Sequence, residues 1–202
     1  KTYFIEKSDP HNITLIRNTV ENVLYSVEHH EDYFYILTNE DNCVNFKLMK
    51  ALVNDFDYWE DVFPYNSNHY LTGLSPLNDF ILIHMRIEGK PNIGIMINNE
   101  VTLMEFDDPN YEIDLIYENA YESETVLLKY QSLITPKTTF RYNCISGEKT
   151  LIHEVIIPEY NKDNYEMEYI YVTATDGSEI PVSILKSVEN TSLIETVPMN
   201  RT

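Results

Sequence analysis

Short stretches of strand-forming residues recur along nearly the whole chain and are separated by polar turns. Several stretches show the alternation of apolar and polar residues that a pleated strand requires. Tight turns are expected at Asp41-Asn42, Asn98-Asn99 and Ser146-Gly147, because Asn, Asp and Gly tolerate a positive φ. No long amphipathic helix is evident, so the chain is predicted to be all-β. The predicted strands fall in three rounds of four: 24–27, 33–38, 46–52 and 59–64; 70–74, 80–87, 92–97 and 101–106; 111–117, 125–133, 139–145 and 150–157.

Four strands in roughly 40 residues is the period of β-propeller blades. A β-sandwich also has short strands at regular spacing, but it does not predict a four-strand repeat. The stretch 2–18, with 12–16 as a possible outer strand, would end an earlier blade. The fold class is therefore predicted to be a partial β-propeller of about three four-stranded blades. An open arc of blades exposes sheet faces and edges, so the isolated chain should be marginally stable, oligomeric or dependent on a partner.

A β-hairpin is predicted after the third blade, between Tyr165 and Leu185. Apolar and polar residues alternate from Tyr169 to Ala174, and the alternation resumes from Ile180 to Ile184. The Asp176-Gly177 pair between these runs is a strong hairpin signal, because Gly accepts a positive φ at which other residues clash.

The charge balance limits the possible partners. The formal net charge is −19 and the pI is near 4.5, and no cluster of Lys and Arg offsets the acidic excess. Binding to nucleic acid or to an anionic membrane surface is therefore not expected. A cationic peptide would be attracted to such a surface, although solubility alone also explains the charge.

The two cysteines, Cys43 and Cys144, lie far apart in the sequence and are predicted to be buried, reduced thiols of a cytoplasmic protein. The apolar runs are too short to span a bilayer, and the first residues have no signal-peptide pattern. A start at Lys1 suggests a piece of a longer protein.

An ordered set of motifs resembles the prolyl oligopeptidase family, specifically its oligopeptidase B (protease II) branch. The resemblance extends over about residues 25–185, in the order and spacing of that family, and fades at Ser187. The motifs are Y-S-V-E-H-H and Y-F-Y-I-L-T-N at 25–30 and 33–39, N-F-K-L at 45–48, W-E-D-V-F-P at 59–64, F-D-D-P-N-Y at 106–111, Y-Q-S-L-I-T-P at 130–136 and A-T-D-G-S-E-I-P-V-S-I-L at 174–185.

The resemblance implies three segments: the C-terminal part of the propeller at 1–162, a hinge hairpin at 163–186 that leads toward an α/β-hydrolase domain, and a tail at 187–202 that departs from the family. It also implies a function as the propeller segment of a serine peptidase that cleaves short peptides after basic residues. The propeller would gate access to the active site. The hydrolase domain would be supplied in cis or by a separate chain.

No catalytic residue is assigned in this chain, because no serine lies on a G-x-S-x-G turn between a strand and a helix. Ser75 comes nearest, but the final Gly is absent and Pro76 has no N–H for an oxyanion hole. Ser178 lies in the predicted hairpin turn. No cofactor or metal motif is found either, so the isolated chain is not expected to hydrolyse peptides.

The remaining titratable residues are predicted to be structural or solvated. His29 and His30, with Glu31 and Asp32, are interpreted as a solvated hairpin, since neighbouring strand residues point to opposite faces and cannot readily share one metal. His11, His69, His84 and His153 lie far apart in the sequence. His84 is expected to be a half-buried strand residue and not a catalytic base. The acidic runs at 105–108, 118–124 and 159–168 are interpreted as solvated loops.

Two alternatives to a peptidase segment stay open. The chain could be a non-enzymatic, acidic module that binds basic peptides or docks to a separate hydrolase chain. It could also be the product of a split gene with no activity. A reading frame downstream that supplies G-x-S-x-G and a later His would favour the peptidase segment and the binding module over the inactive product of a split gene.

Overall fold

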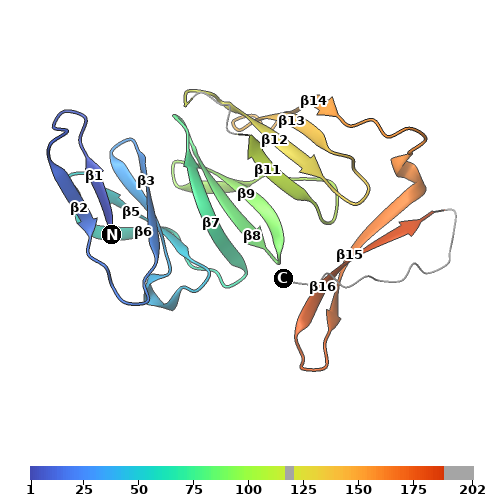
Figure 1. Ribbon diagram of the computed structural model, residues 1–202, viewed down its shortest axis with the longest axis horizontal. Helices are drawn as coiled ribbons and strands as arrows, with labels where there is room; N and C mark the ends of the chain where they lie inside the picture. Colours follow the sequence, from blue (N-terminus) through green and yellow to red (C-terminus); the bar gives the residue numbers. More distant parts are fainter. Residues whose placement is uncertain (117–120, 189–202) are drawn as a thin grey trace. The chain divides into compact units, whose positions relative to one another are not determined.

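The computed structural model describes residues 1–116 and 121–188, and in these ranges the regular structure consists of β-strands and two short 3-10 helices (Figure 1). The described residues form two compact units. The first contains residues 1–88, 92–104 and 121–123, and the second contains residues 89–91, 105–116 and 124–188.

The first unit holds one two-stranded and two four-stranded sheets, all antiparallel. In both four-stranded sheets, strands that are consecutive in the chain are neighbours in the sheet, as in a propeller blade. The strands are β1 (Thr2–Ile5) and β2 (Ile13–Arg17); β3 (Tyr25–His30), β4 (Tyr33–Thr38), β5 (Lys47–Leu52) and β6 (Asp55–Phe63); and β7 (His69–Pro76), β8 (Ile81–Ile87), β9 (Lys90–Ile97) and β10 (Glu100–Leu103).

The β3–β6 sheet is covered on both faces. On one face, Leu48 and Leu37 pack with Ile83 of the β7–β10 sheet, and all three are almost fully buried. On the other face, Ile36 packs with Ile16 of β2. Successive side chains of β4 therefore pack into two different cores. This explains why all residues from Phe34 to Thr38 are buried, with no alternation of buried and exposed positions.

The second unit holds a third four-stranded meander, β11 (Glu112–Ile116), β12 (Thr125–Gln131), β13 (Thr138–Asn143) and β14 (Lys149–Glu154). Its core includes Val126, Leu128 and Tyr130 of β12, all of which are buried. A linker of residues 155–164 follows β14 and ends in the 3-10 helix η2 (Lys162–Asn164). The hairpin of β15 (Tyr165–Thr173) and β16 (Glu179–Ser187) comes next.

The sequence-based prediction of the fold is confirmed. Each of the twelve expected strands overlaps one strand of β3 to β14, and the three rounds of four are the three four-stranded sheets. The expected outer strand at 12–16 is β2, while its partner β1 was not predicted as a separate strand.

The predicted turns also have the expected backbone conformation. Asp41 and Asn42 have φ of 59° and 61°, and Asn98 and Asn99 have φ of 52° and 66°. Gly177 has φ of +85° in the turn that joins β15 to β16, where Ala174 N–H bonds to Ser178 O. The hairpin register, in which Thr173 lies opposite Glu179, follows from this short turn.

No helix among the described residues is long and apolar enough to cross a membrane. The predicted division into residues 1–162, 163–186 and 187–202 stays a prediction, and most of its last segment lies outside the described residues.

Candidate functional site

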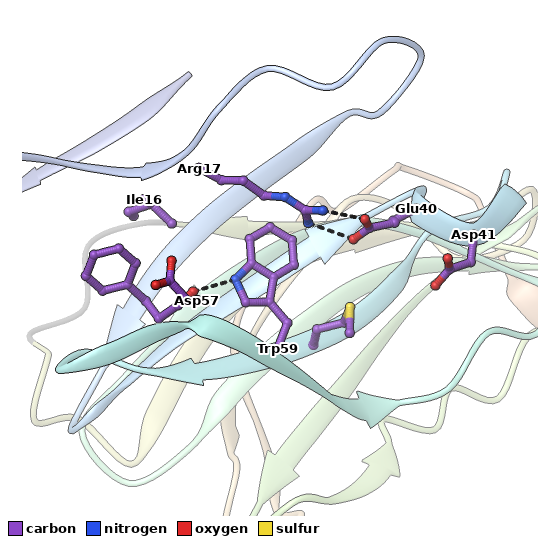
Figure 2. Close-up of a pocket in the computed structure, with 8 residues that line it drawn as sticks. Ile16, Arg17, Glu40, Asp41, Asp57 and Trp59 are labelled. Atoms are coloured by element: carbon purple, nitrogen blue, oxygen red, sulfur yellow. Dashed lines mark hydrogen bonds and ion pairs between the residues drawn. The ribbon is translucent and has the colours of Figure 1, made fainter.

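The first unit contains an open pocket of about 370 Å³ between β2, β5, β6 and the 3-10 helix η1 (Glu40–Asn42). The pocket combines apolar walls with charged side chains at its edge (Figure 2). Its lining residues are Ile16, Arg17, Glu40, Asp41, Met49, Phe56, Asp57 and Trp59.

An ion pair lies across one side of the pocket. Arg17 donates two hydrogen bonds to the Glu40 carboxylate, Nη1 to Oε2 at 2.7 Å and Nη2 to Oε1 at 2.5 Å. The guanidinium carbon lies 4.3 Å from the centre of the Trp59 ring, and Figure 2 shows the planar group beside the indole. The hydrogen bond to Glu40 raises the pKa of Arg17, which keeps the guanidinium charged. Arg17 therefore neutralises Glu40, and the pocket lining has two other carboxylates.

Those other carboxylates are Asp41 and Asp57. Asp41 accepts a hydrogen bond from Lys47 Nζ at 3.0 Å, and Lys47 lies outside the pocket lining. Asp57 is exposed, and no partner for its carboxylate is found among the described residues. Trp59, whose Nε1 donates to Phe56 O at 2.9 Å, and Met49 supply apolar surface beside these charges. This combination suits a cationic group on an apolar stem, such as a Lys or Arg side chain.

The structure also brings together a serine and a histidine that the sequence did not connect. Ser75 Oγ of β7 lies 2.8 Å from His84 Nε2 of β8. Burial lowers the pKa of His84, so its ring is neutral near pH 7. Within the described part of the chain no carboxylate hydrogen-bonds to this ring, and Pro76 has no N–H to stabilise an oxyanion. The pair lies within two strands and not on a turn before a helix, so it lacks the features of a catalytic dyad.

The interpretation of His30 as part of a solvated hairpin is wrong. The turn lies at Glu31 and Asp32, and both histidines belong to β3. His30 is buried and its Nε2 lies 2.6 Å from Leu77 O, at the end of the next blade's first strand. His29 is exposed and lies edge-on to Phe34. His29 and His30 point to opposite faces of β3, which explains why one is exposed and the other is buried.

The other histidines and the thiols lie largely as expected. His84 is half-buried in β8, as predicted, and Cys43 and Cys144 are free and buried. Burial raises the pKa of both thiols, that of Cys144 to about 12, so neither is a reactive thiolate near neutral pH. His11 and His153 are exposed, and His69 stacks on Phe63. In the described ranges no three His, Cys, Asp or Glu side chains are grouped to hold a metal ion.

The first acidic run is only partly solvated, which corrects the prediction for Asp108. Glu105 and Asp107 are exposed, but Asp108 is buried and accepts hydrogen bonds from Tyr130 and Thr135. Burial alone would raise the pKa of Asp108, but hydrogen bonds from hydroxyl groups, Thr135 foremost, outweigh it and lower the pKa to about 2. The partners lie more than 20 residues away in the sequence, so the motif F-D-D-P-N-Y alone did not reveal this burial.

The second acidic run fits the prediction of a solvated loop where the structure describes it. Glu122 and Glu124 are exposed, and residues 118–120 lie outside the described ranges. The prediction of a loop is wrong for the end of the third run. Glu159 is exposed outside the strands, but Glu166 and Glu168 belong to β15, and Glu168 pairs with Lys186 of β16.

Residues 1–155 match the family model of the prolyl oligopeptidase N-terminal β-propeller domain. Because this match covers more than half of the chain, the protein belongs to that family of propeller domains.

Among curated proteins, the chain is 33% identical over 172 residues to Protease 2 of Moraxella lacunata, an alignment that covers 85% of this chain and 25% of that protein. It is 22% identical over 182 residues to dipeptidyl aminopeptidase BI of Pseudoxanthomonas mexicana, covering 88% of this chain and 25% of that protein. The chain thus spans about a quarter of the length of these relatives.

Solved structures show the same fold. Oligopeptidase B from Leishmania major superposes with a TM-score of 0.79 at 22% identity, over 93% of this chain and 28% of that one. Oligopeptidase B from Trypanosoma brucei with covalently bound antipain gives a TM-score of 0.78 at 21% identity, over 92% of this chain and 28% of that one. The expected fold, a partial propeller of the prolyl oligopeptidase family, is confirmed.

Proposed function

We propose that this chain is the C-terminal arc of the propeller, together with the hinge hairpin, of an oligopeptidase B-like serine peptidase that cleaves short peptides after basic residues. The observation that carries the proposal is the 33% identity to Protease 2 over 172 residues, a stretch longer than the propeller match of residues 1–155. The proposed division is propeller at 1–162, hinge hairpin at 163–186 and a tail at 187–202.

In this function the propeller limits access to an active site in a hydrolase domain, present in cis or as a separate chain. A serine assisted by His and Asp in that domain attacks the peptide through an acyl-enzyme, and no residue of this chain takes part in bond cleavage. The net charge of −19 supports attraction of basic peptides by long-range steering. The free thiols Cys43 and Cys144 are compatible with a cytoplasmic location.

The hairpin offers further support for a neighbouring hydrolase domain. Ile170, Val172 and Ile180 are exposed by 38% to 48% of their surface. Apolar strand residues exposed together are typical of a surface that another element covers. A hydrolase domain that continues from the hairpin would provide that cover.

The test compares two purified proteins on short Lys- and Arg-ester or amide substrates and on a folded basic protein. The first is the 202-residue chain, and the second is the longest native polypeptide that contains it. We expect turnover of the short substrates by the longer polypeptide only, and no cleavage of the folded protein by either. The variant S75A of the longer polypeptide should keep its kcat/KM within about twofold, since Ser75 has no catalytic role. Turnover by the 202-residue chain alone would contradict the proposal.

The pocket beside Trp59 favours a second candidate function, the capture of basic peptides without catalysis. Its exposed Asp57 carboxylate lies beside an apolar wall, as a Lys or Arg side chain requires. Binding of an Arg-rich peptide should then survive about 0.15 M salt, where purely long-range attraction is screened.

Two matched variants of β6 separate this pocket from general surface charge. D57N should weaken binding of the Arg-rich peptide by about tenfold, because it removes a charge-assisted hydrogen bond. D55N removes the same charge from an exposed residue of the same strand that does not line the pocket, and it should leave the Kd nearly unchanged. Equal effects of the two variants would exclude the pocket as the binding site.

A further inference from the structure

A buried carboxylate connects the β11–β14 blade to the linker of residues 155–164. Asp108, in the loop before β11, is only 6% exposed. Its Oδ2 accepts hydrogen bonds from Tyr130 Oη at 2.7 Å and from Thr135 Oγ1 at 2.6 Å. Both donors belong to the blade, one on β12 and the other in the loop that follows it. These bonds hold the carboxylate inside the blade through Oδ2, and Oδ1 is available for a bond to another residue.

That other residue is Lys162, at the start of η2 in the linker. Lys162 Nζ donates to Asp108 Oδ1 at 3.0 Å and to Thr135 Oγ1 at 2.8 Å. A buried carboxylate is costly without a compensating charge, and Lys162 supplies it. Because Asp108 and Lys162 are 54 positions apart in the chain, their ion pair closes a large loop and joins the linker to the blade.

Two additional contacts lie beside this ion pair. Tyr160 Oη donates to Ile134 O at 2.6 Å, next to Thr135, and the Tyr160 ring stacks on Tyr165 at the start of β15. Asn110 Nδ2, two residues after Asp108, donates to Ser183 Oγ of β16 at 2.9 Å. The linker and the hairpin are therefore attached to the same blade through separate side chains.

We propose that Asp108, Thr135 and Lys162 form a clasp that holds the linker rigidly on the β11–β14 blade. Resting on the proposed function, this inference means that the linker is no flexible tether between propeller and hydrolase domain. The blade and the base of the hairpin move as one body. When the propeller and the hydrolase domain separate to admit a peptide, the rotation therefore occurs at residues outside 155–164. Loss of the clasp makes the linker itself a hinge.

Hydrogen exchange of the 202-residue chain, followed by mass spectrometry of peptides from the linker and from β12–β13, tests the clasp. In K162M, we expect exchange in the linker to become about tenfold faster or more, as expected for loss of a charge-assisted hydrogen bond. Exchange in β12–β13 should be unchanged. The matched control is K186M, since Lys186 is a similarly exposed lysine, 44% against 46%, whose ion pair with Glu168 lies within the hairpin.

D108N provides a second variant that removes the partner charge, and it should accelerate linker exchange in the same way. The clasp is overturned if K162M exchanges like wild type in the linker, or if the wild-type linker exchanges at the rate of an unprotected peptide. It is also overturned if K186M has the same effect as K162M. Because the readout does not involve peptide cleavage, a failure of the proposed peptidase function would not produce any of these results.

Discussion

At the scale of single residues, Asp108 makes the stability of its unit depend on acid pH. Its pKa in the folded chain is lowered to about 2 from an ordinary value of 3.8, so the ionised form stabilises the fold. This contribution is fully present above about pH 4 and is lost as the pH falls toward 2. We expect D108N to lower the free energy of unfolding by about 1–2 kcal/mol at pH 7 and by much less at pH 2.5. Urea denaturation at both pH values measures the difference.

The control for this prediction is the neighbouring residue. D107N removes the same charge from an exposed side chain, so its effect on unfolding should be within about 0.5 kcal/mol at either pH. An equal loss of stability in D107N and D108N would show that net charge, and not the buried hydrogen bonds, is responsible.

At the scale of strands and turns, the hairpin depends on the backbone of Gly177. Its φ of +85° is costly for any residue with a Cβ, although no atom would contact a Cβ placed there. G177A should therefore destabilise the pairing of β15 with β16 by about 1 kcal/mol through backbone strain alone. Faster hydrogen exchange in residues 165–187, with unchanged exchange in the first unit, would confirm this. S178A, which keeps the Gly at the turn, should leave exchange in the hairpin close to wild type.

The elements were the part of the fold that the sequence predicted best. Strand periodicity and turn residues are local, so β3 to β14 and the positive φ at Asn98 and Asn99 could be foreseen. The burial of polar side chains, in contrast, depends on contacts between residues that lie far apart in the sequence, so it could not be predicted. His30 and Leu77 are 47 positions apart, and only the packing of one sheet on the next brings them together. The same holds for the Ser75–His84 pair and for the pocket beside Trp59, which depend on pairing between strands and packing between sheets.

At the scale of the whole molecule, exposed apolar side chains among the described residues predict self-association of the 202-residue chain. Tyr3, Ile5 and Ile13 of the β1–β2 sheet are each more than half exposed, and Ile156 after β14 is 88% exposed. Exposed apolar side chains favour association, whereas the net charge of −19 opposes it. Raising the salt from about 0.05 to about 0.5 M screens the repulsion, so we expect the sedimentation coefficient to increase with salt. A 23.8 kDa monomer at every salt and protein concentration would contradict this prediction.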